Sequence, residues 1–324
     1  MRHKKLGSSD LELSVIGLGT WAMGGEGWRF SWGPQEDEES IKTIHHALDL
    51  GINWIDTAPV YGLGHSEEVV GKALRGMSDR PIIATKCSRK AKPDGQLYSE
   101  LKLDSVIREA EDSLARLQVD VIDLYQIHWA RPEEDIEEGW EAIGKLIQDG
   151  KVRYGGVSNF KVEHMQRCQP IHPITSLQPP YNMVVRDIEG EILQYCEKND
   201  IGIICYSPLY KGLFTGAFSK ERLANMPESD HRLNDPHFQE PELSANLELV
   251  EHLQGIAESL GITVAQLTIA WTLRHQQMTA AIVGGRKPEQ LDETSRAGDV
   301  VLEKHVIQQI NALLEEREKA LRSR

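Results

Sequence analysis

Short apolar runs of strand type recur along the chain, separated by longer amphipathic stretches. The 324 residues hold eight such runs, at 15–19, 53–57, 82–87, 121–128, 152–157, 175–178, 202–206 and 280–283. The stretches between them carry apolar residues three or four positions apart, as helices do, over 39–50, 103–117, 136–148 and 264–274. Strand–helix alternation predicts a parallel sheet with helices outside it. Eight units in one chain favour a closed (β/α)₈ barrel of the α/β class over an open, doubly wound sheet.

Three segments lie outside this repeat. Residues 6–13 predict a β-hairpin ahead of the first barrel strand, where it could plug the barrel floor. Residues 209–244, rich in Gly, Pro, Asn and charge, predict a lid or binding loop. Residues 303–324 have a helical pattern beyond the last strand. We therefore expect a single domain over 1–324, a TIM barrel with an N-terminal β-hairpin and an extra C-terminal helix.

Charge and composition narrow the classes of partner. The 36 basic and 50 acidic residues give a net charge of −14, which disfavours nucleic acid and anionic membranes. No apolar stretch reaches the roughly 18 residues of a membrane span, and the first residues lack a signal-peptide pattern, so we expect a cytoplasmic protein. The four cysteines form no CxxC pair, and neither histidines nor carboxylates show metal-ligand spacing, so no metal site is predicted. The oligomeric state is left open.

Polar residues mark the ends of the second, third and fourth predicted strands: Asp56 with Tyr61 nearby, Lys86, and His128. The carboxyl ends of strands are where barrels of this kind place their chemistry. Taken singly, Asp56 would be a turn residue, Tyr61 a packing residue and His128 a hydrogen-bonded core histidine. For Lys86 a structural and a functional interpretation are evenly balanced. The combination favours function.

Together these four side chains suit the reduction of a carbonyl group. Hydride addition to C=O leaves an alkoxide that needs a proton, and a free tyrosine, with a pKa of ~10, donates slowly near neutral pH. The Lys86 ammonium is expected to lower the pKa of Tyr61, while Asp56 holds Lys86 charged. His128 is expected to donate a hydrogen bond to the carbonyl oxygen. Tyr61 is the predicted proton donor.

A known family shares this pattern. Residues 51–62, GINWIDTAPVYG, with Glu67 and Gly71 following, resemble the signature of the aldo-keto reductases. Lys86 and His128 fall where the remaining catalytic residues of that family stand, and the resemblance covers essentially the whole chain. It is nearest to bacterial members of the branch that also contains the potassium-channel β subunits. The resemblance implies a catalytic tetrad of Asp56, Tyr61, Lys86 and His128 and an NADP(H)-dependent reduction of aldehydes or ketones.

The resemblance also implies a nicotinamide site at the later strand ends. Ser158, Asn159 and Gln178 would bind the carboxamide, and Tyr206 would stack on the ring. The remaining implied contacts, with the pyrophosphate on the long loop and with the near side of the cofactor, are Ser207, Pro208, Leu209, Lys211, Gly212, Gly19, Thr20, Trp21 and Asp56.

A glycine-rich turn follows the eighth strand at Gly284 and Gly285. Glycines ahead of a helix let backbone N–H groups approach a phosphate, and Arg286 can hold a ribose 2′-phosphate by two donors at once. The alternative is a solvated basic helix start. By resemblance, Gln290 would lie near the phosphate and Glu293 near the adenine, although Thr294 stands where the family often has Asn. NADPH is expected over NADH.

Aromatic residues are expected around the substrate, with Trp21, Tyr61 and Trp129 as its pocket. For Trp28 and Trp32, a place in the pocket and a structural role in covering the top of the barrel are equally favoured. Two other functions remain open at this point. One is a nucleotide-binding regulatory or redox-sensing partner protein of the channel β-subunit type, which the intact tetrad disfavours. The other is a cofactor-free barrel lyase or isomerase, for which the expected metal-binding or phosphate-plus-base pattern is missing.

Overall fold

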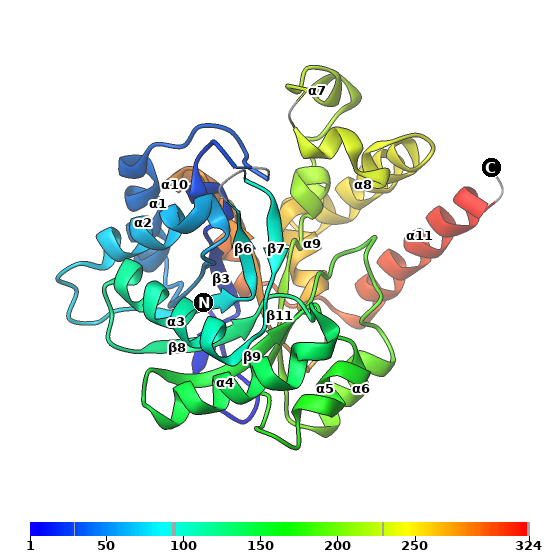
Figure 1. Cartoon of the computed structure of the whole chain (residues 1–324). Coiled ribbons are helices and arrows are strands. Elements are labelled where there is room, and N and C mark those ends of the chain that lie inside the picture. Colours follow the sequence, from blue (N-terminus) through cyan, green and yellow to red (C-terminus); the bar gives the residue numbers. More distant parts are fainter. Residues whose placement is uncertain (29, 93–94, 229, 323–324) are drawn as a thin grey trace.

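The computed structural model describes residues 1–28, 30–92, 95–228 and 230–322. Within them, parallel strands close into a barrel in the order β10-β11-β12-β3-β4-β5-β8-β9 (Figure 1). Its strands are β3 (Ile16–Gly19), β4 (Trp54–Asp56), β5 (Ile82–Cys87), β8 (Ile122–Ile127), β9 (Val152–Ser158), β10 (Ser176–Gln178), β11 (Gly202–Tyr206) and β12 (Met278–Gly284). Pairing of the last strand with the first closes the ring, with Ala281 opposite Ile16. The predicted (β/α)₈ barrel is confirmed, and every predicted apolar run overlaps one of these strands.

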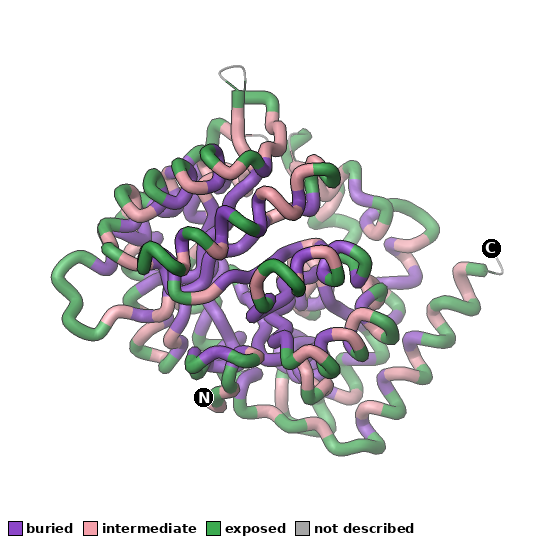
Figure 2. The backbone as a smooth tube through the Cα atoms, turned by 60° about the horizontal axis from the view of Figure 1, so that its bottom comes forward, coloured by how far each residue is buried: buried purple, intermediate pink, exposed green. Residues whose placement is uncertain are grey.

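Helices surround the barrel. They are α1 (Asp37–Asp49), α2 (His65–Leu74), α3 (Leu103–Leu117), α4 (Ile136–Gln148), α5 (Val162–Cys168), α6 (Glu191–Lys198), α9 (Val264–Thr272) and α10 (Pro288–Ser295). The periodicity that predicted them is a burial pattern: in α3, Val106 and Ala110 are buried while Asp112 is exposed. Figure 2 shows the same division, with buried backbone inside and exposed turns on the outer faces of the helices. No helix among the described residues is long and apolar enough to cross a membrane.

A hairpin seals one end of the barrel. β1 (His3–Lys5) pairs antiparallel with β2 (Glu12–Ser14), so the paired strands flank the predicted segment 6–13 and most of that segment is the connecting loop. Leu6, Leu11 and Leu13 pack into the barrel interior, each at most 2% exposed, against side chains such as Trp54 and Leu124. Gly7 turns the loop at φ +49°, and a Cβ there would lie 2.5 Å from the Thr175 carbonyl oxygen. The hairpin plugs the barrel floor, as expected.

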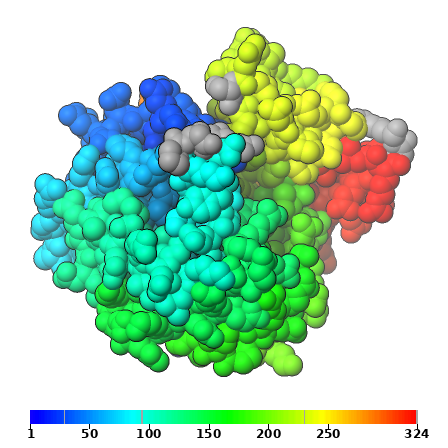
Figure 3. Space-filling view, viewed as in Figure 1, coloured from blue at the N-terminus to red at the C-terminus, as the bar shows by residue number. Residues whose placement is uncertain are grey.

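The long segment after β11 contains short helices: η4 (Tyr210–Thr215), α7 (Lys220–Ala224), η5 (His231–Asn234) and η6 (Pro236–Phe238), which lead into α8 (Glu242–Ser259). The C-terminal helix α11 (Lys304–Arg322) packs on α8, where Arg317 Nε donates to Asn246 Oδ1 at 2.6 Å. In Figure 3 the surface is hollowed between the yellow segment around α8 and the cyan hairpin of β6 (Arg89–Ala91) and β7 (Leu97–Ser99). The hollow lies at the carboxyl ends of the barrel strands.

The sealed floor gives a stability prediction. Leu6→Ala should lower the free energy of unfolding by about 3 kcal/mol, because a wholly buried leucine leaves a cavity that the barrel wall cannot fill. Val301→Ala, at a side chain 72% exposed, is the control and should change the free energy by less than about 0.5 kcal/mol. Urea unfolding followed by circular dichroism measures both. Equal, small effects would show that the hairpin contributes little to the core.

Candidate active site

Strand alternation carries Asp56 and Lys86 to the mouth of the barrel. Trp54 and Ala84 point into the barrel interior, so the residues two positions later, Asp56 and Lys86, point inward too, one layer higher. The Lys86 side chain is 0% exposed. Its Nζ donates to Asp56 Oδ2 at 2.7 Å, to the Thr57 carbonyl at 2.9 Å and to Tyr61 Oη at 3.3 Å. An ammonium has three donors, and these three acceptors match them.

Tyr61 opens the short helix η2 (Tyr61–Gly64) and is 9% exposed. Burial, and secondly the Asp56 carboxylate, raise the pKa of Tyr61 well above 10. The sequence led us to expect the opposite direction. The reason for the difference is first the burial of the hydroxyl, and secondly Asp56, which is bound to Lys86 at 2.7 Å and offsets the charge of the ammonium. Tyr61 therefore stays a neutral hydroxyl, which has a proton to give.

His128 directly follows β8 and completes the group of four. Its ring meets that of Tyr61 edge-on, with centroids 6.1 Å apart and planes at 85°. Burial, followed by the charges of Lys86 and Arg89, lowers the pKa of His128 well below 6.5, so the imidazole is neutral and has one N–H to donate. Its Nδ1 is buried and has no hydrogen-bond partner within the described parts of the chain. A polar atom in this position is suited to a ligand.

Two polar residues support the group from behind. Glu67, in α2 and 0% exposed, accepts from Thr85 Oγ1 at 2.6 Å and from Arg116 Nε at 2.7 Å, which fixes the outer face of β5 beside Lys86. Gln126 lies on the inner face of β8, where its Nε2 is 3.5 Å from Asp56 Oδ1. Sequence reasoning passed over Gln126. The available signal was its position two residues before His128 in the predicted strand 121–128, and so on the same face.

The residues expected at the nicotinamide form one hydrogen-bonded network. Ser158 Oγ donates to the Gln178 carbonyl at 2.8 Å, and Asn159 Nδ2 donates to Ser158 Oγ and to the His128 carbonyl at 3.0 Å each. Tyr206 Oη donates to Asn159 Oδ1 at 2.8 Å, which fixes the tilt of the Tyr206 ring. Gln178 Nε2 donates to Asp56 Oδ1 at 2.8 Å. This last bond joins the network to the Lys86 group.

The long loop and the first-strand loop meet above this network. Trp21 stacks on Tyr61, with centroids 5.8 Å apart, and also on His231 of the long loop, at 6.2 Å. Lys211, expected at the pyrophosphate, is bound to Asp235 at 2.5 Å, so its charge is already offset. The other expected contacts of these loops are Gly19, Thr20, Ser207, Pro208, Leu209 and Gly212. Thr20 Oγ1 donates to the Asp56 carbonyl at 3.1 Å, and a Cβ at Gly212 would meet nothing within 4 Å.

The turn after β12 carries the expected phosphate residues. Gly284 is exposed, and a Cβ there would come no closer than 3.8 Å to any other group, so the backbone is open to a ligand. Gln290 Oε1 accepts the backbone N–H of Arg286 at 2.7 Å, which makes it a cap of α10 and leaves its amide NH₂ as its donor. Glu293 is exposed, and its carbonyl accepts from Gln266 Nε2 at 2.9 Å. The open backbone at Gly284 and the amide NH₂ of Gln290 suit a nucleotide phosphate.

The expected substrate pocket is only partly assembled. Trp28 lies 6.2 Å from Tyr61 and 6.1 Å from Trp21, so these three rings form one wall. Trp129 is half-buried, with the Arg131 guanidinium 5.7 Å from its ring, and makes no ring contact with that wall in the part of the chain that is described. Trp28 is therefore the aromatic neighbour that the expected pocket of Trp21, Tyr61 and Trp129 left out.

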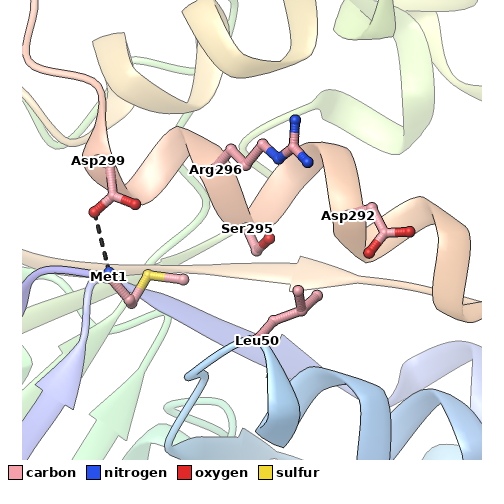
Figure 4. Close-up of a pocket in the computed structure, with 6 residues that line it drawn as sticks. All are labelled: Met1, Leu50, Asp292, Ser295, Arg296 and Asp299. Atoms are coloured by element: carbon pink, nitrogen blue, oxygen red, sulfur yellow. Dashed lines mark ion pairs between the residues drawn. The ribbon is translucent and has the colours of Figure 1, made fainter.

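Two cavities of the structure lie away from this group. One, of about 140 Å³, lies between α1 and α10, where the amine of Met1 pairs with Asp299 at 3.1 Å (Figure 4). The other, of about 210 Å³, is lined by residues such as Arg2 and Arg274. Neither contains any of the four residues at the barrel mouth.

A buried carboxyl supports the end of β5 from the α3 side. Ser88, which follows β5 at φ +79°, donates its backbone N–H to Glu109 Oε2 at 3.0 Å. Burial raises the pKa of Glu109 to about 7, opposed by Lys90 and by the bonds from Ser88 and Ser105. A non-glycine residue at positive φ is strained, and the Glu109 carboxyl helps to hold it there. Glu109 is thus linked through Ser88 to the strand that carries Lys86.

Comparisons with known proteins place the chain among reductases. A model of the aldo/keto reductase family matches residues 15–315. Aldo-keto reductase YhdN of Bacillus subtilis is 40% identical over 318 residues, which cover 97% of this chain and 94% of that protein. NADH-specific methylglyoxal reductase of Escherichia coli is 32% identical over 316 residues, 93% of this chain and 95% of that protein. The solved glycerol dehydrogenase AKR11B4 of Gluconobacter oxydans superposes with a TM-score of 0.89 at 37% identity, over 97% of this chain and 95% of that one.

The raised pKa of Glu109 predicts a pH-dependent stability. The folded chain keeps a proton that the unfolded chain releases near 4.5, so this contribution is full below pH 4.5 and is lost as the pH rises through about 7. The advantage of the native protein over Glu109→Gln should shrink across this range, by on the order of 2 kcal/mol. Urea unfolding at a series of pH values tests this. Asp112→Asn, exposed on the same helix, is the control and should run parallel to the native protein. A parallel curve for Glu109→Gln would contradict the prediction.

Proposed function

This chain belongs to the aldo/keto reductase family, and we propose that it interconverts small aldehydes or ketones with alcohols, using NADPH as the hydride source. One observation carries the proposal: Tyr61 is a buried, neutral hydroxyl 3.3 Å from a buried ammonium that Asp56 holds in place. This arrangement keeps a proton available and has a cation ready to receive the negative charge that its departure leaves behind.

The proton transfer follows from the contacts of Lys86. Tyr61 gives its Oη proton to the substrate oxygen as that oxygen becomes an alkoxide, and the O–H bond breaks as the new one forms. The phenolate that remains faces Lys86 Nζ at 3.3 Å. Asp56 keeps the ammonium charged and in position, in opposition to the burial that lowers the pKa of Lys86. The neutral His128 donates its N–H to the same substrate oxygen and orients it.

The cofactor supplies the hydride when bound. The network of Ser158, Asn159 and Gln178 would hold the carboxamide, and the Tyr206 ring would stack on the nicotinamide. Gln178 donates to Asp56, so this network is joined to the group of Asp56, Lys86 and Tyr61 by one hydrogen bond. The Escherichia coli relative is named NADH-specific, so membership of the family does not determine the choice between NADPH and NADH. Arg286 supports NADPH here.

The wall of Trp21, Trp28 and Tyr61 gives the mouth an aromatic side and favours a substrate with apolar surface. A relative named methylglyoxal reductase and a structural neighbour named glycerol dehydrogenase point to small carbonyl compounds and alcohols as the first panel to assay.

Replacement of the proton donor is the main test. Tyr61→Phe should lower kcat for carbonyl reduction by on the order of 10²-fold or more and leave the Kd for NADPH unchanged, because only the acid is removed. Tyr154→Phe, in the lower half of β9, is the matched control and should keep full activity. Steady-state assays with NADPH, together with quenching of tryptophan fluorescence, give both quantities. Undiminished turnover by Tyr61→Phe would reject Tyr61 as the donor.

Loss of the phosphate arginine tests the cofactor. Arg286→Ala should raise the Kd for NADPH by on the order of 10-fold and that for NADH far less, since only NADPH carries the 2′-phosphate. Arg296→Ala removes a positive charge at the other end of α10 and serves as the control. Equal weakening of both nucleotides would remove Arg286 from the 2′-phosphate site.

A further inference from the structure

The guanidinium of Arg286 is held by a segment far away in the sequence. Its Nε donates to Gln35 Oε1 at 3.0 Å, its Nη1 donates to the Trp32 carbonyl at 3.1 Å, and its Nη2 donates to the Pro34 carbonyl. Gln35 also donates from its Nε2 to the Arg286 carbonyl at 2.9 Å. One glutamine thus binds both the side chain and the backbone of Arg286, which fixes the direction of the guanidinium.

Every acceptor in this group is neutral. They are one side-chain amide and two backbone carbonyls, and in the described ranges no carboxylate lies within 4 Å of the Arg286 guanidinium. A guanidinium has five N–H donors, so two remain, one on each Nη. Arg286 is therefore positioned with its full charge and with two donors on neighbouring nitrogens. That pair of donors matches the oxygens of a phosphate.

We propose that Gln35 is a specificity-determining residue, which positions Arg286 for the 2′-phosphate of the cofactor without neutralising it. A shorter or apolar residue at this position would remove the bond to Nε and the bond to the Arg286 carbonyl, and so would hold the guanidinium less firmly. A glutamate would still bind Nε but would supply the anion that Arg286 lacks, so it would compete with the phosphate. The neutral amide satisfies both requirements. This inference rests on the proposed use of NADPH and deepens it.

Three variants separate positioning from charge. Gln35→Met keeps the size of the side chain and removes its hydrogen bonds, whereas Gln35→Glu keeps the acceptor and adds a charge. Gln276→Glu adds the same charge ahead of β12, at the opposite end of the strand that leads to Arg286, and is the control. The Kd values for NADPH and NADH are measured by quenching of tryptophan fluorescence, and binding of 2′,5′-ADP and 5′-AMP by calorimetry. Circular dichroism shows that each variant is folded.

The ratio of the two Kd values is the deciding quantity. Gln35→Glu should lower the preference for NADPH over NADH by on the order of 10-fold, and Gln35→Met by about 3-fold, with Kd for NADH unchanged in both. The affinity for 2′,5′-ADP should fall more in Gln35→Glu than in Gln35→Met, while the affinity for 5′-AMP stays native in both. Gln276→Glu should keep the native affinities for all four nucleotides. A native preference in Gln35→Glu would overturn the role of Gln35. A native protein that binds NADPH no better than NADH would instead overturn the proposed cofactor, and this inference with it.

Discussion

The site depends on one buried charge. Lys86 is wholly enclosed by the barrel, and an ammonium there is tolerable only because Asp56, the Thr57 carbonyl and Tyr61 accept its three hydrogens. Satisfying that charge requires the ends of β4 and β5 and the start of η2 to converge. The same requirement places the Tyr61 hydroxyl beside a cation. The contacts that stabilise the buried charge of Lys86 are therefore the same contacts that build the site.

Much of this could be predicted from the sequence, because strand alternation and strand ends are local properties. The pattern Trp54 to Asp56 sets which side chains face inward, and closure of the barrel brings neighbouring strand ends together. The direction of the Tyr61 pKa shift was wrong, since it depends on the balance between burial, Asp56 and Lys86, and a sequence contains no distances. For the same reason the sequence does not identify the partners of Gln126 and Gln35. A glutamine has no characteristic spacing, and its partner can lie anywhere in the chain.

The loops differ from the strands in how they reach the site. Trp21, Trp28 and His231 lie in loops. The barrel strands fix where each of these loops begins and ends, but they do not fix the path of the loop between those points. Their ring contacts arise between the first-strand loop and the long loop after β11, far apart in the chain. Aromatic residues in such loops indicate a pocket but not which of them are in contact. The expected pocket therefore included Trp129, which makes no ring contact with Trp21 in the described ranges, and left out Trp28, which does. The barrel strands and the residues that closely follow them thus carry the group of four, and the longer loops determine its surroundings.

The hairpin under the barrel determines from which end the site can be reached. With Leu6, Leu11 and Leu13 filling the floor, the barrel interior is packed with side chains and closed at the hairpin end. Whatever occupies the mouth also separates the Tyr61 hydroxyl from bulk water. In the proposed reaction, a proton that leaves Tyr61 is therefore replaced from the mouth side, the same side on which the product departs.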